Sequence, residues 1–598
     1  MRFKSKKHQG FQVFAVSGIN TISFAIDATA EAKKGLLGFA VERLDPQEDQ
    51  RFFMRGFKVF PSVIPHPGKH TQVSTFDHPV QSFVWDDFTA KSGRKYTYFF
   101  YPLRGKPKNL DRSAGALEIE VETEPLFSKL THDVFFNRGV ASSQAYSNRF
   151  NNMSPSELAK KVSAAKAQEA LNWLSRELDD ALLKFIGQAK KGDTLLCCFY
   201  EFRYRPVADA LKAAIDRKVN VRLIIDAKVN KTKDKKGKVH PSFPREDNLQ
   251  MLEDAEIPET KVIFREAKPN DIQHNKFMVL LKGKTKRPSE VWTGSTNISE
   301  GGIHGQTNVG HWVRDAETAR HFQAYWELLS KDPGGQKGDD DAEVRRKNKE
   351  YREHVEALYD VPLEIDDIPV GITPVFSPRS GLDVLNMYVD MVDSADASSF
   401  VTLAFGINKA FRDRLLDNPP NGHIVFLLLE KQDKPNPKNP DAFVAINAKN
   451  NVYKAWGSFL REPIYKWIKE TNAGILKLNT HVSYVHSKFL LMDPLTEDPI
   501  VVTGSANFSD ASTNSNDENM LIIRGDQRVA DIYFTEFNRI FNHYYFRSVV
   551  ETTTTTNRDQ SADSMFLKEQ ALEWLVKYQP GKLRQKRVAL YTTMTGFA

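Results

Sequence analysis

Two stretches of the sequence, HNKFMVLL at residues 274–281 and HSKFLLMD at residues 486–493, share one arrangement of residues. Each begins with a histidine, places a lysine two residues later and continues with apolar side chains. Each is followed by a second related stretch, VWTGSTN at residues 291–297 and VVTGSAN at residues 501–507. The histidine precedes the glycine by 20 residues in the first copy (294 − 274) and by 18 in the second (504 − 486). An internal repeat at matching distances therefore decides the fold.

The spacing within each copy places the histidine and the lysine on one face of a strand. Alternate residues of a strand point to the same side, so His274 and Lys276 project together, as do His486 and Lys488. A single histidine of this kind is more often a structural residue, but two pairs at matching distances favour catalysis. If a pseudo-twofold axis brings the copies together, cations surround one point with a histidine on each side. This arrangement suits a phosphodiester that reacts through a pentacoordinate state.

These residues resemble the signature of the phospholipase D superfamily, HxKxxxxD followed by Gly-Ser-x-Asn, with two copies in one chain. The second copy fits in full through His486, Lys488 and Asp493, whereas Leu281 stands at the aspartate position of the first copy. In the family this aspartate supports local structure more than bond breaking. Its loss puts the setting of the first half-site in question but leaves its histidine and lysine in place. The resemblance covers roughly residues 126–550.

The resemblance implies a metal-independent hydrolysis through a covalent phosphohistidine. It makes His274 the nucleophile and His486 the general acid, which then activates water. Glu518 is expected to orient a histidine through its other ring nitrogen, while the first copy has Gln306-Thr307-Asn308 there and lacks a carboxylate. The residues expected to bind the phosphoryl oxygens are Lys276, Lys488, Asn297 and Asn507, with Ser295 and Ser505 in support. No cofactor or metal is expected, because the lysines and histidines already supply positive charge.

The predicted fold class is α/β, with two pseudo-twofold-related phospholipase D-like α-β-α sandwich units preceded by a small all-β domain. Residues 1–125 show short alternating strands and frequent turns, which indicate a β-sandwich-like domain, or alternatively an irregular β extension of the next domain. The two units are expected at residues 126–332 and 369–550. A polar linker at 333–368 joins them, and a C-terminal tail at 551–598 follows.

The strands and helices of the two units are expected in the same order. A capping box at residues 154–157 predicts one long helix that reaches roughly Lys190. Apolar runs and amphipathic patterns predict further strands and helices, and this order is typical of a mostly parallel sheet that is covered on both faces. The expected strands are 195–200, 221–226, 400–405 and 423–429, and the expected helices are 207–217, 382–392 and 409–417.

The composition is that of a folded chain with a modest positive charge. Of 598 residues, 40% are hydrophobic and 27% charged, and the net charge is +7. The two cysteines, Cys197 and Cys198, are adjacent within an apolar run and are interpreted as core residues. Residues 11–26 are interpreted as two strands rather than a signal peptide, and no run of apolar residues predicts a transmembrane helix, so a cytoplasmic location is expected.

Three functions remain open at this stage. A nuclease is favoured, because lysine-rich runs at residues 231–238 and 282–287 would attract a polyanion, although such runs are also ordinary solvated loops. A phospholipase D or phosphatidyl transferase would use the same chemistry, and the amphipathic segment 565–577 is its one candidate for contact with a membrane surface, without stable insertion. A catalytically inactive phosphodiester-binding module is the third. The sequence leaves open whether the N-terminal domain binds a partner.

Overall fold

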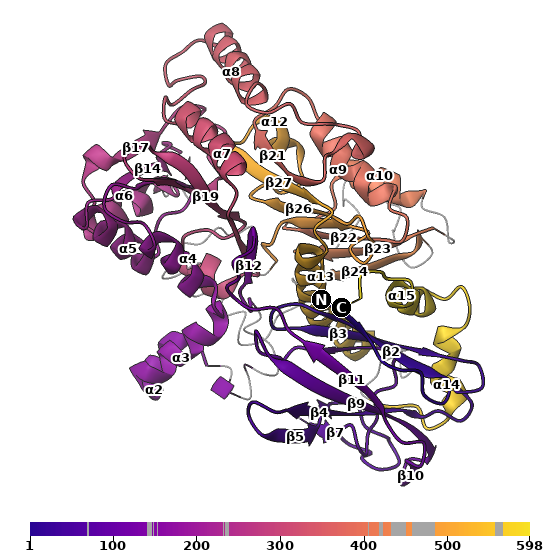
Figure 1. Ribbon diagram of the computed structural model, residues 1–598. Helices are drawn as coiled ribbons and strands as arrows, with labels where there is room; N and C mark the ends of the chain where they lie inside the picture. The colour runs from indigo at the N-terminus through magenta and orange to yellow at the C-terminus, as the bar shows by residue number, and fades with distance from the viewer. Residues whose placement is uncertain are drawn as a thin grey trace.

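The computed structural model describes residues 1–67, 71–139, 146, 149–151, 153–230, 232–233, 239–404, 406–417, 422–431, 450–456, 485–556 and 566–597. Two α/β units lie beside each other, and a β region from the N-terminal residues lies below them in the view of Figure 1. The chain ends lie close together near the centre of the molecule, where Arg2 donates a hydrogen bond to the carbonyl of Thr595 over 2.8 Å (Figure 1).

The N-terminal region consists of two antiparallel sheets that share one hydrophobic core. The first sheet has the order β1 (Arg2–Lys4), β2 (Phe11–Ser17), β3 (Ile22–Ala28) and β8 (Val84–Asp87). The second has the order β10 (Asn109–Asp111), β9 (Lys95–Lys106), β4 (Gly38–Asp45) and β5 (Gln50–Phe53), and β11 (Leu117–Glu122) also pairs with β9. A short pair, β6 (Arg55–Gly56) and β7 (Val73–Ser74), completes the region. Alternating apolar residues of both sheets, such as Phe24 and Tyr98, meet in the core.

Each α/β unit contains a seven-stranded sheet with the same strand order. The sheet of the first unit runs β12 (His132–Phe136), β20 (Val309–Val313), β19 (Arg287–Gly294), β18 (Lys276–Lys282), β13 (Thr194–Phe199), β14 (Asn220–Asp226) and β17 (Val262–Arg265). The sheet of the second unit runs β21 (Gly371–Ser377), β27 (Glu518–Arg524), β26 (Ile500–Gly504), β25 (Phe489–Met492), β22 (Ser398–Leu403), β23 (Ile424–Leu429) and β24 (Val452–Trp456). The repeat seen in the sequence is thus a repeat of topology.

The expectation of a mostly parallel sheet is wrong. Within the described residues, only the last three strands of each sheet are parallel to one another, as in β13 with β14 and β14 with β17. The other pairings are antiparallel, including β18 with β19 and β25 with β26, which carry the repeated motifs. The physical reason is that each motif is a hairpin: its two strands are joined by a short turn, and a short turn permits only antiparallel pairing.

The long helix expected from residue 154 is also wrong, because the chain forms three helices there. The capping box does begin α2 (Pro155–Lys161), but Ser163 caps a new helix, α3 (Ala164–Ser175), and its side chain accepts a hydrogen bond from the Lys166 amide. Arg176, with φ of 48°, then ends α3 before α4 (Leu178–Gly187). The remaining helices of the first unit are α5 (Arg205–Asp216), α6 (Arg245–Asp254), a π-helix (Gly301–Gly305) and α7 (Ala316–Leu329).

The second unit follows the connector that the sequence predicts as a linker. This connector contains α8 (Asp341–Glu356), which projects at the top of Figure 1. The helices after it are α9 (Asp383–Asp393), α10 (Lys409–Leu416), α12 (Asp510–Asn514), α13 (Gln527–Thr556), α14 (Ala571–Leu575) and α15 (Leu583–Thr592). Aromatic residues of α7 and α13 pack between the two sheets; for example, Phe322 contacts Phe376 and Tyr533 contacts Phe136. One core therefore joins the units and fixes their relative position.

The C-terminal segment docks on the N-terminal β region. Trp574 of α14 is buried in the core of that region, and its indole nitrogen donates to the carbonyl of Leu36 over 2.9 Å. Of the amphipathic segment expected at 565–577, Met565 lies outside the described residues. Trp574 of this segment therefore packs within the chain. Leu572 and Val576 remain exposed.

Candidate active site

The two repeated motifs meet where the units join, and each unit holds the histidine backbone of the other. Gln273 pairs with Asp517 in an isolated parallel bridge, and Val485 pairs with Thr307 in the same way. The His274 amide donates to the carbonyl of Asp517 over 2.9 Å, and the His486 amide donates to that of Thr307 over 3.3 Å. These two bridges are related by the pseudo-twofold symmetry of the repeat, so the site is assembled only from both halves.

The two histidine rings face each other, as the repeat predicts. The ring centroids of His274 and His486 lie 6.5 Å apart with their planes at 74°. Their relative exposures are 5% and 6%, so each ring retains little contact with solvent. Lys276 and Lys488 are buried beside them, and each lysine ammonium donates to the carbonyl of the histidine two residues before it. Four groups that can carry positive charge thus surround one small volume.

Each histidine is oriented by a residue of the opposite unit. Glu518 accepts a hydrogen bond from Nδ1 of His274 at 2.9 Å, and Asn308 lies 2.9 Å from Nδ1 of His486 through its Oδ1 atom. Both positions follow the motif glycine by 14 residues (518 − 504 and 308 − 294), so they are equivalent in the repeat. With Nδ1 held as a donor by the opposite unit, the Nε2 atom of each ring lies on the side away from Glu518 or Asn308. The sequence predicts no role for Asn308, because the first copy has no carboxylate at this position.

The motif serines hold these orienting residues. The hydroxyl of Ser505 donates to Glu518 over 2.6 Å, and that of Ser295 donates to Asn308 Oδ1 over 2.9 Å. Each serine oxygen also accepts a backbone amide, from Asn519 and Val309 respectively. The serines therefore act on the histidines through Glu518 and Asn308, whereas the sequence predicts that they support phosphate binding.

Burial and neighbouring charges make the two histidines unequal. Burial lowers the pKa of His274, and the carboxylate of Glu518 partly offsets this effect. Burial also lowers the pKa of His486, to well below its usual value, and Lys488 and Lys276 lower it further without an opposing carboxylate beside the ring. Burial therefore favours the neutral form of both rings in the free protein, and only His274 has a carboxylate that opposes this effect.

The lysines and Glu518 are affected by the same lack of solvent. Burial lowers the pKa of Lys276 to about 8, and burial together with Lys276 lowers that of Lys488 well below its usual value. Burial alone would raise the pKa of Glu518, but His274, Lys276 and Ser505 outweigh it and lower that pKa. A bound phosphate would supply the negative charge that this cluster of cations lacks.

A buried carboxylate that the sequence analysis missed, Glu201, lies in the same site. Its Oε1 atom accepts a hydrogen bond from the side-chain amide of Asn297 over 3.0 Å, and Arg203 donates to its other oxygen over 2.8 Å. Because an ionised carboxylate only accepts, this contact must use the NH₂ group of Asn297. The Oδ1 atoms of Asn297 and Asn507 are both buried without a hydrogen-bond partner among the described residues. Glu201 follows β13 by two residues, at a strand end, and that position was the only signal in the sequence.

Tyr200 forms one wall of the site. Its ring meets the His274 ring edge to face at 5.2 Å, and the Lys276 ammonium lies 5.4 Å from its centroid. Phe202, two residues further along, is fully buried against Phe199. Arg203 forms ion pairs with Glu201 and Asp247.

The aspartate of the motif is a structural residue in the second unit and has been relocated in the first. Asp493 accepts the backbone amides of residues 396, 397 and 398 at 2.7–2.9 Å, which ties β25 to the start of β22. Leu281, at the same place in the first copy, is buried and pairs with Thr194. The neighbour of that threonine, Asp193, accepts the amides of Gly283 at 2.8 Å and Lys190 at 2.9 Å. In each unit a carboxylate joins the two equivalent strands. In the second unit it directly follows β25, and in the first unit it directly precedes β13.

Two paired units, each with a histidine and a lysine directed at a common point, define a site of the phospholipase D type. The family model described as cardiolipin synthase, phospholipase D-like domain, matches residues 182–329 and 388–541, together about half of the chain. This chain belongs to the phospholipase D superfamily. No curated protein sequence is significantly similar to it.

Several solved structures are similar to parts of this chain. Phosphatidylserine synthase of Haemophilus influenzae is 14% identical, with a TM-score of 0.40, over 64% of this chain and 92% of that protein. Nuc of Salmonella typhimurium, a phospholipase D family member, is 21% identical, with a TM-score of 0.19, over 25% of this chain and 84% of that protein. NucT of Helicobacter pylori is 21% identical, with a TM-score of 0.20, over 26% and 90% respectively. These similarities are too low to assign a substrate.

Among the described residues, no group of three or more histidine, cysteine, aspartate or glutamate side chains is arranged to hold a metal ion. In the same part of the chain, no helix combines the length and the apolar character that crossing a bilayer requires.

Proposed function

We propose that this protein is a phosphodiesterase that acts through a covalent phosphohistidine, with His274 as nucleophile and His486 as acid and base. The observation that carries the proposal is the close approach of the two rings, whose centroids lie 6.5 Å apart and each of which is held through Nδ1. If a phosphorus atom lies between the two Nε2 atoms, one of them can attack it while the leaving group departs on the side of the other. Lys276 and Lys488 then bind the equatorial phosphoryl oxygens.

The first step forms a bond between nitrogen and phosphorus. The lone pair on Nε2 of His274 attacks phosphorus, the bond to the leaving oxygen breaks, and that oxygen takes a proton from Nε2 of protonated His486. Since the pKa of His486 is lowered in the free protein, we propose that it gains this proton as the anionic substrate binds. The products of the step are the free alcohol, a phosphoryl group on His274 and a neutral His486.

The second step releases the phosphoryl group. Neutral His486 removes a proton from a water molecule, whose oxygen attacks phosphorus while the bond to His274 breaks. A phosphomonoester leaves, and both histidines return to their starting states. If an alcohol takes the place of water, the same step transfers the phosphoryl group, as a phosphatidyl transferase would.

The assignment of the two roles follows from the residues behind the rings. A phosphorylated imidazole that keeps its Nδ1 proton carries a positive charge, and a carboxylate beside it stabilises that charge. Glu518 stands behind His274, whereas the neutral amide of Asn308 stands behind His486. A histidine that must both give and take a proton is better served by the neutral partner. The pair therefore favours His274 as the nucleophile.

We propose nucleic acid as the substrate class. The chain carries a net charge of +7, and lysines flank the turn between β18 and β19, so a polyanion is attracted to it. The segment considered for contact with a membrane surface instead packs Trp574 into the N-terminal β region, which weakens the case for phospholipid. The N-terminal region remains a candidate for binding a partner.

Activity in EDTA tests the substrate class directly. Plasmid DNA, a single-stranded oligonucleotide and phosphatidylcholine vesicles are compared, with His486→Asn as the matched inactive variant. We expect cleavage of nucleic acid by the wild type and loss of that cleavage in the variant. Cleavage of vesicles alone would replace nucleic acid with phospholipid as the substrate, and equal activity in the variant would overturn the assignment of the site.

A further inference from the structure

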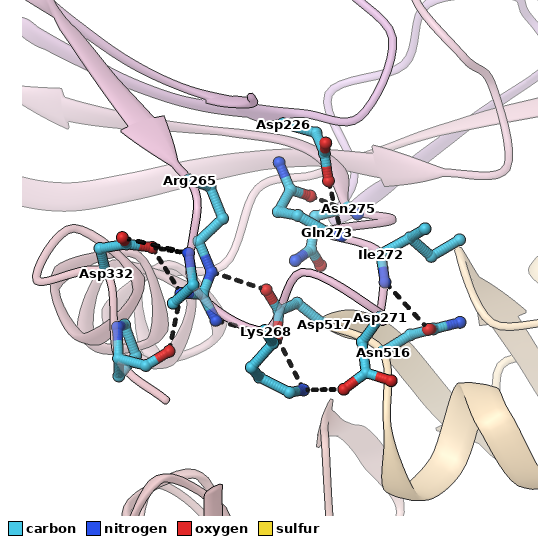
Figure 2. Close-up of polar contacts among 12 residues, drawn as sticks. Asp226, Arg265, Lys268, Asp271, Ile272, Gln273, Asn275, Asp332, Asn516 and Asp517 are labelled. Atoms are coloured by element: carbon cyan, nitrogen blue, oxygen red, sulfur yellow. Dashed lines mark hydrogen bonds and ion pairs between the residues drawn. The ribbon is translucent and has the colours of Figure 1, made fainter. Parts of the chain in front are cut away.

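A buried ion pair joins the two units one residue away from the group that orients His274. Arg265, at the end of β17, is fully buried, and its Nε atom donates to Asp517 of the second unit over 2.9 Å (Figure 2). Tyr351 of the connector helix α8 donates to the other oxygen of Asp517 over 3.0 Å. The carboxylate of Asp517 is itself fully buried. Three separate parts of the chain thus converge on one side chain.

Neighbouring charges complete this cluster, which we call the Asp517 cluster (Arg265, Lys268, Asp332, Tyr351 and Asp517). Arg265 also donates to Asp332 over 2.6 Å, and the Lys268 ammonium lies 3.8 Å from Asp517 (Figure 2). Burial alone would raise the pKa of Asp517, but Arg265 and Lys268 outweigh it and lower that pKa to about 2. Asp517 is therefore charged at any working pH. Figure 2 also shows that the chain leads from this cluster directly to residues 272–275.

The backbone of Asp517 holds the strand that carries the nucleophile. Its amide donates to the carbonyl of Ile272 over 3.0 Å, and its carbonyl accepts the amide of His274 over 2.9 Å. The next residue, Glu518, accepts the Nδ1 proton of the same histidine. A shift of residue 517 would therefore move both the backbone and the ring contact of His274 at once.

Among the described residues, which leave out 457–484, the other half-site has no such cluster. Thr307 stands at the position equivalent to Asp517, and its carbonyl and hydroxyl each lie 3.3 Å from the His486 amide. Its hydroxyl also lies 3.3 Å from that of Ser487. At this position a neutral hydroxyl therefore contacts the backbone of His486, whereas on the other side the residue that holds the His274 backbone is a charged member of an ion pair. A buried ion pair adds little net stability, because the cost of removing its charges from water offsets their attraction, so stability alone does not explain the difference.

We propose that the Asp517 cluster is a positioning device that fixes Glu518 against His274 and so serves the step in which His274 attacks phosphorus. This inference rests on the proposed function for its catalytic part. Arg265, Asp517 and Tyr351 act through Glu518 and the backbone, and none of them touches the substrate. The connector that the sequence predicts as a linker thereby contributes to the active site through Tyr351.

The experiment separates the two steps with bis(p-nitrophenyl) phosphate. Its leaving group departs without help from an acid, so the initial burst of p-nitrophenol reports attack by His274, and the later steady rate reports release of the phosphoryl group. The test variants are Asp517→Asn and Arg265→Lys, of which the second keeps all charges and loses the planar donor geometry. Thr307→Val, at the equivalent position of the other half-site, is the matched control.

We expect the burst rate to fall roughly tenfold in Asp517→Asn and by a smaller factor in Arg265→Lys, because a small displacement of the nucleophile is costly. Thr307→Val is expected to slow the steady rate and leave the burst rate unchanged. Circular dichroism establishes that each variant is folded. An unchanged burst rate in both folded test variants would show that the cluster is only structural.

A second measurement does not depend on turnover. The pKa of His274 is followed by nuclear magnetic resonance, with its signal assigned by its absence in His274→Asn. The charged or titratable groups that face this ring are Glu518, Lys276, Lys488, His486 and Tyr200. Loosening Glu518 removes support for the imidazolium, so the pKa of His274 is expected to fall in both test variants. If no phosphodiester is cleaved but this pKa falls, the proposed function fails and the positioning role stands. If cleavage persists and the pKa is unchanged, the positioning role fails.

Discussion

The two half-sites come from one repeated motif, yet they differ in charge at three equivalent positions. Glu518 behind His274 corresponds to Asn308 behind His486, and Asp517 corresponds to Thr307. The third difference is the aspartate of the motif, which is Asp493 in the second copy. In the first two positions the negative charge comes from the second unit and acts on the histidine of the first. The comparison teaches that a site with twofold backbone symmetry can still place different charges beside two identical side chains.

The two histidines provide the largest contrast. His274→Asn is expected to abolish both the burst and the steady turnover of bis(p-nitrophenyl) phosphate, a loss on the order of 10³-fold or more. His486→Asn is expected to keep the burst, since p-nitrophenol needs no acid, and to lose the steady turnover, since no base activates water. Rapid-quench kinetics distinguish the two outcomes. A burst in His274→Asn and none in His486→Asn would reverse the roles.

The residues behind the rings provide the next contrast. Glu518→Gln removes the charge that supports a cationic phosphohistidine, and the burst rate is expected to fall by roughly 10²-fold, as when one preorganised group that stabilises developing charge is lost. Asn308→Asp adds a carboxylate behind His486, which raises the pKa of that ring and leaves the burst nearly unchanged. The burst rates of both variants, measured with the same substrate, are the test. Equal losses in the two variants would mean that the half-sites are interchangeable.

The lysines give a smaller effect that appears in the pH profile. Burial lowers the pKa of Lys276 to about 8 and lowers that of Lys488 well below its usual value. The cationic forms bind the phosphoryl oxygens at lower pH and are lost as the pH rises, so kcat/KM is expected to decline at or below about pH 8. Arginine keeps its charge, so Lys488→Arg is expected to move this decline upward, whereas Lys276→Arg leaves it in place because Lys488 still loses its proton first. A decline that stays in place in both variants would assign it to another group.

How much of this site the sequence predicts depends on whether a feature lies within one motif or between two. The pairs His274 with Lys276 and His486 with Lys488 follow from the period of a strand and from the repeat, so they were predicted. The orientation of each histidine by the opposite unit was not predicted, because it depends on how two distant segments pair. Glu201 was missed for a related reason, since one glutamate after a strand has no pattern around it.

The errors in the fold have similar physical causes. The apolar strands predict a sheet covered on both faces, but their order along the chain does not reveal that each motif is a hairpin, so the parallel character was overestimated. The helix expected from residue 154 satisfies a helical pattern on both sides of Ser163. A serine in that pattern is compatible with a helix interior or with a new cap, and tertiary packing of α3 selects the cap.

The relocated aspartate gives the smallest effect on activity and a clear effect on stability. Asp493→Ala leaves three backbone amides without their acceptor and is expected to cost about 2–3 kcal/mol, whereas Asp193→Ala leaves two and is expected to cost about 1–2 kcal/mol. Thermal denaturation and hydrogen exchange at residues 396–398 and 283 measure these losses.

The exchange variant Asp193→Ala with Leu281→Asp moves the carboxylate of the first unit to the side that it occupies in the second. If the two arrangements are equivalent, this double variant recovers part of the stability that Asp193→Ala loses, because residue 281 pairs with Thr194 and the new carboxylate again ties β18 to the start of β13. The burst rate of bis(p-nitrophenyl) phosphate should stay within about twofold of the wild type, since neither position touches a histidine. A double variant less stable than Asp193→Ala alone would show that the first unit has adapted its packing to Leu281. The missing aspartate would then be a real loss in the first copy and not a relocation.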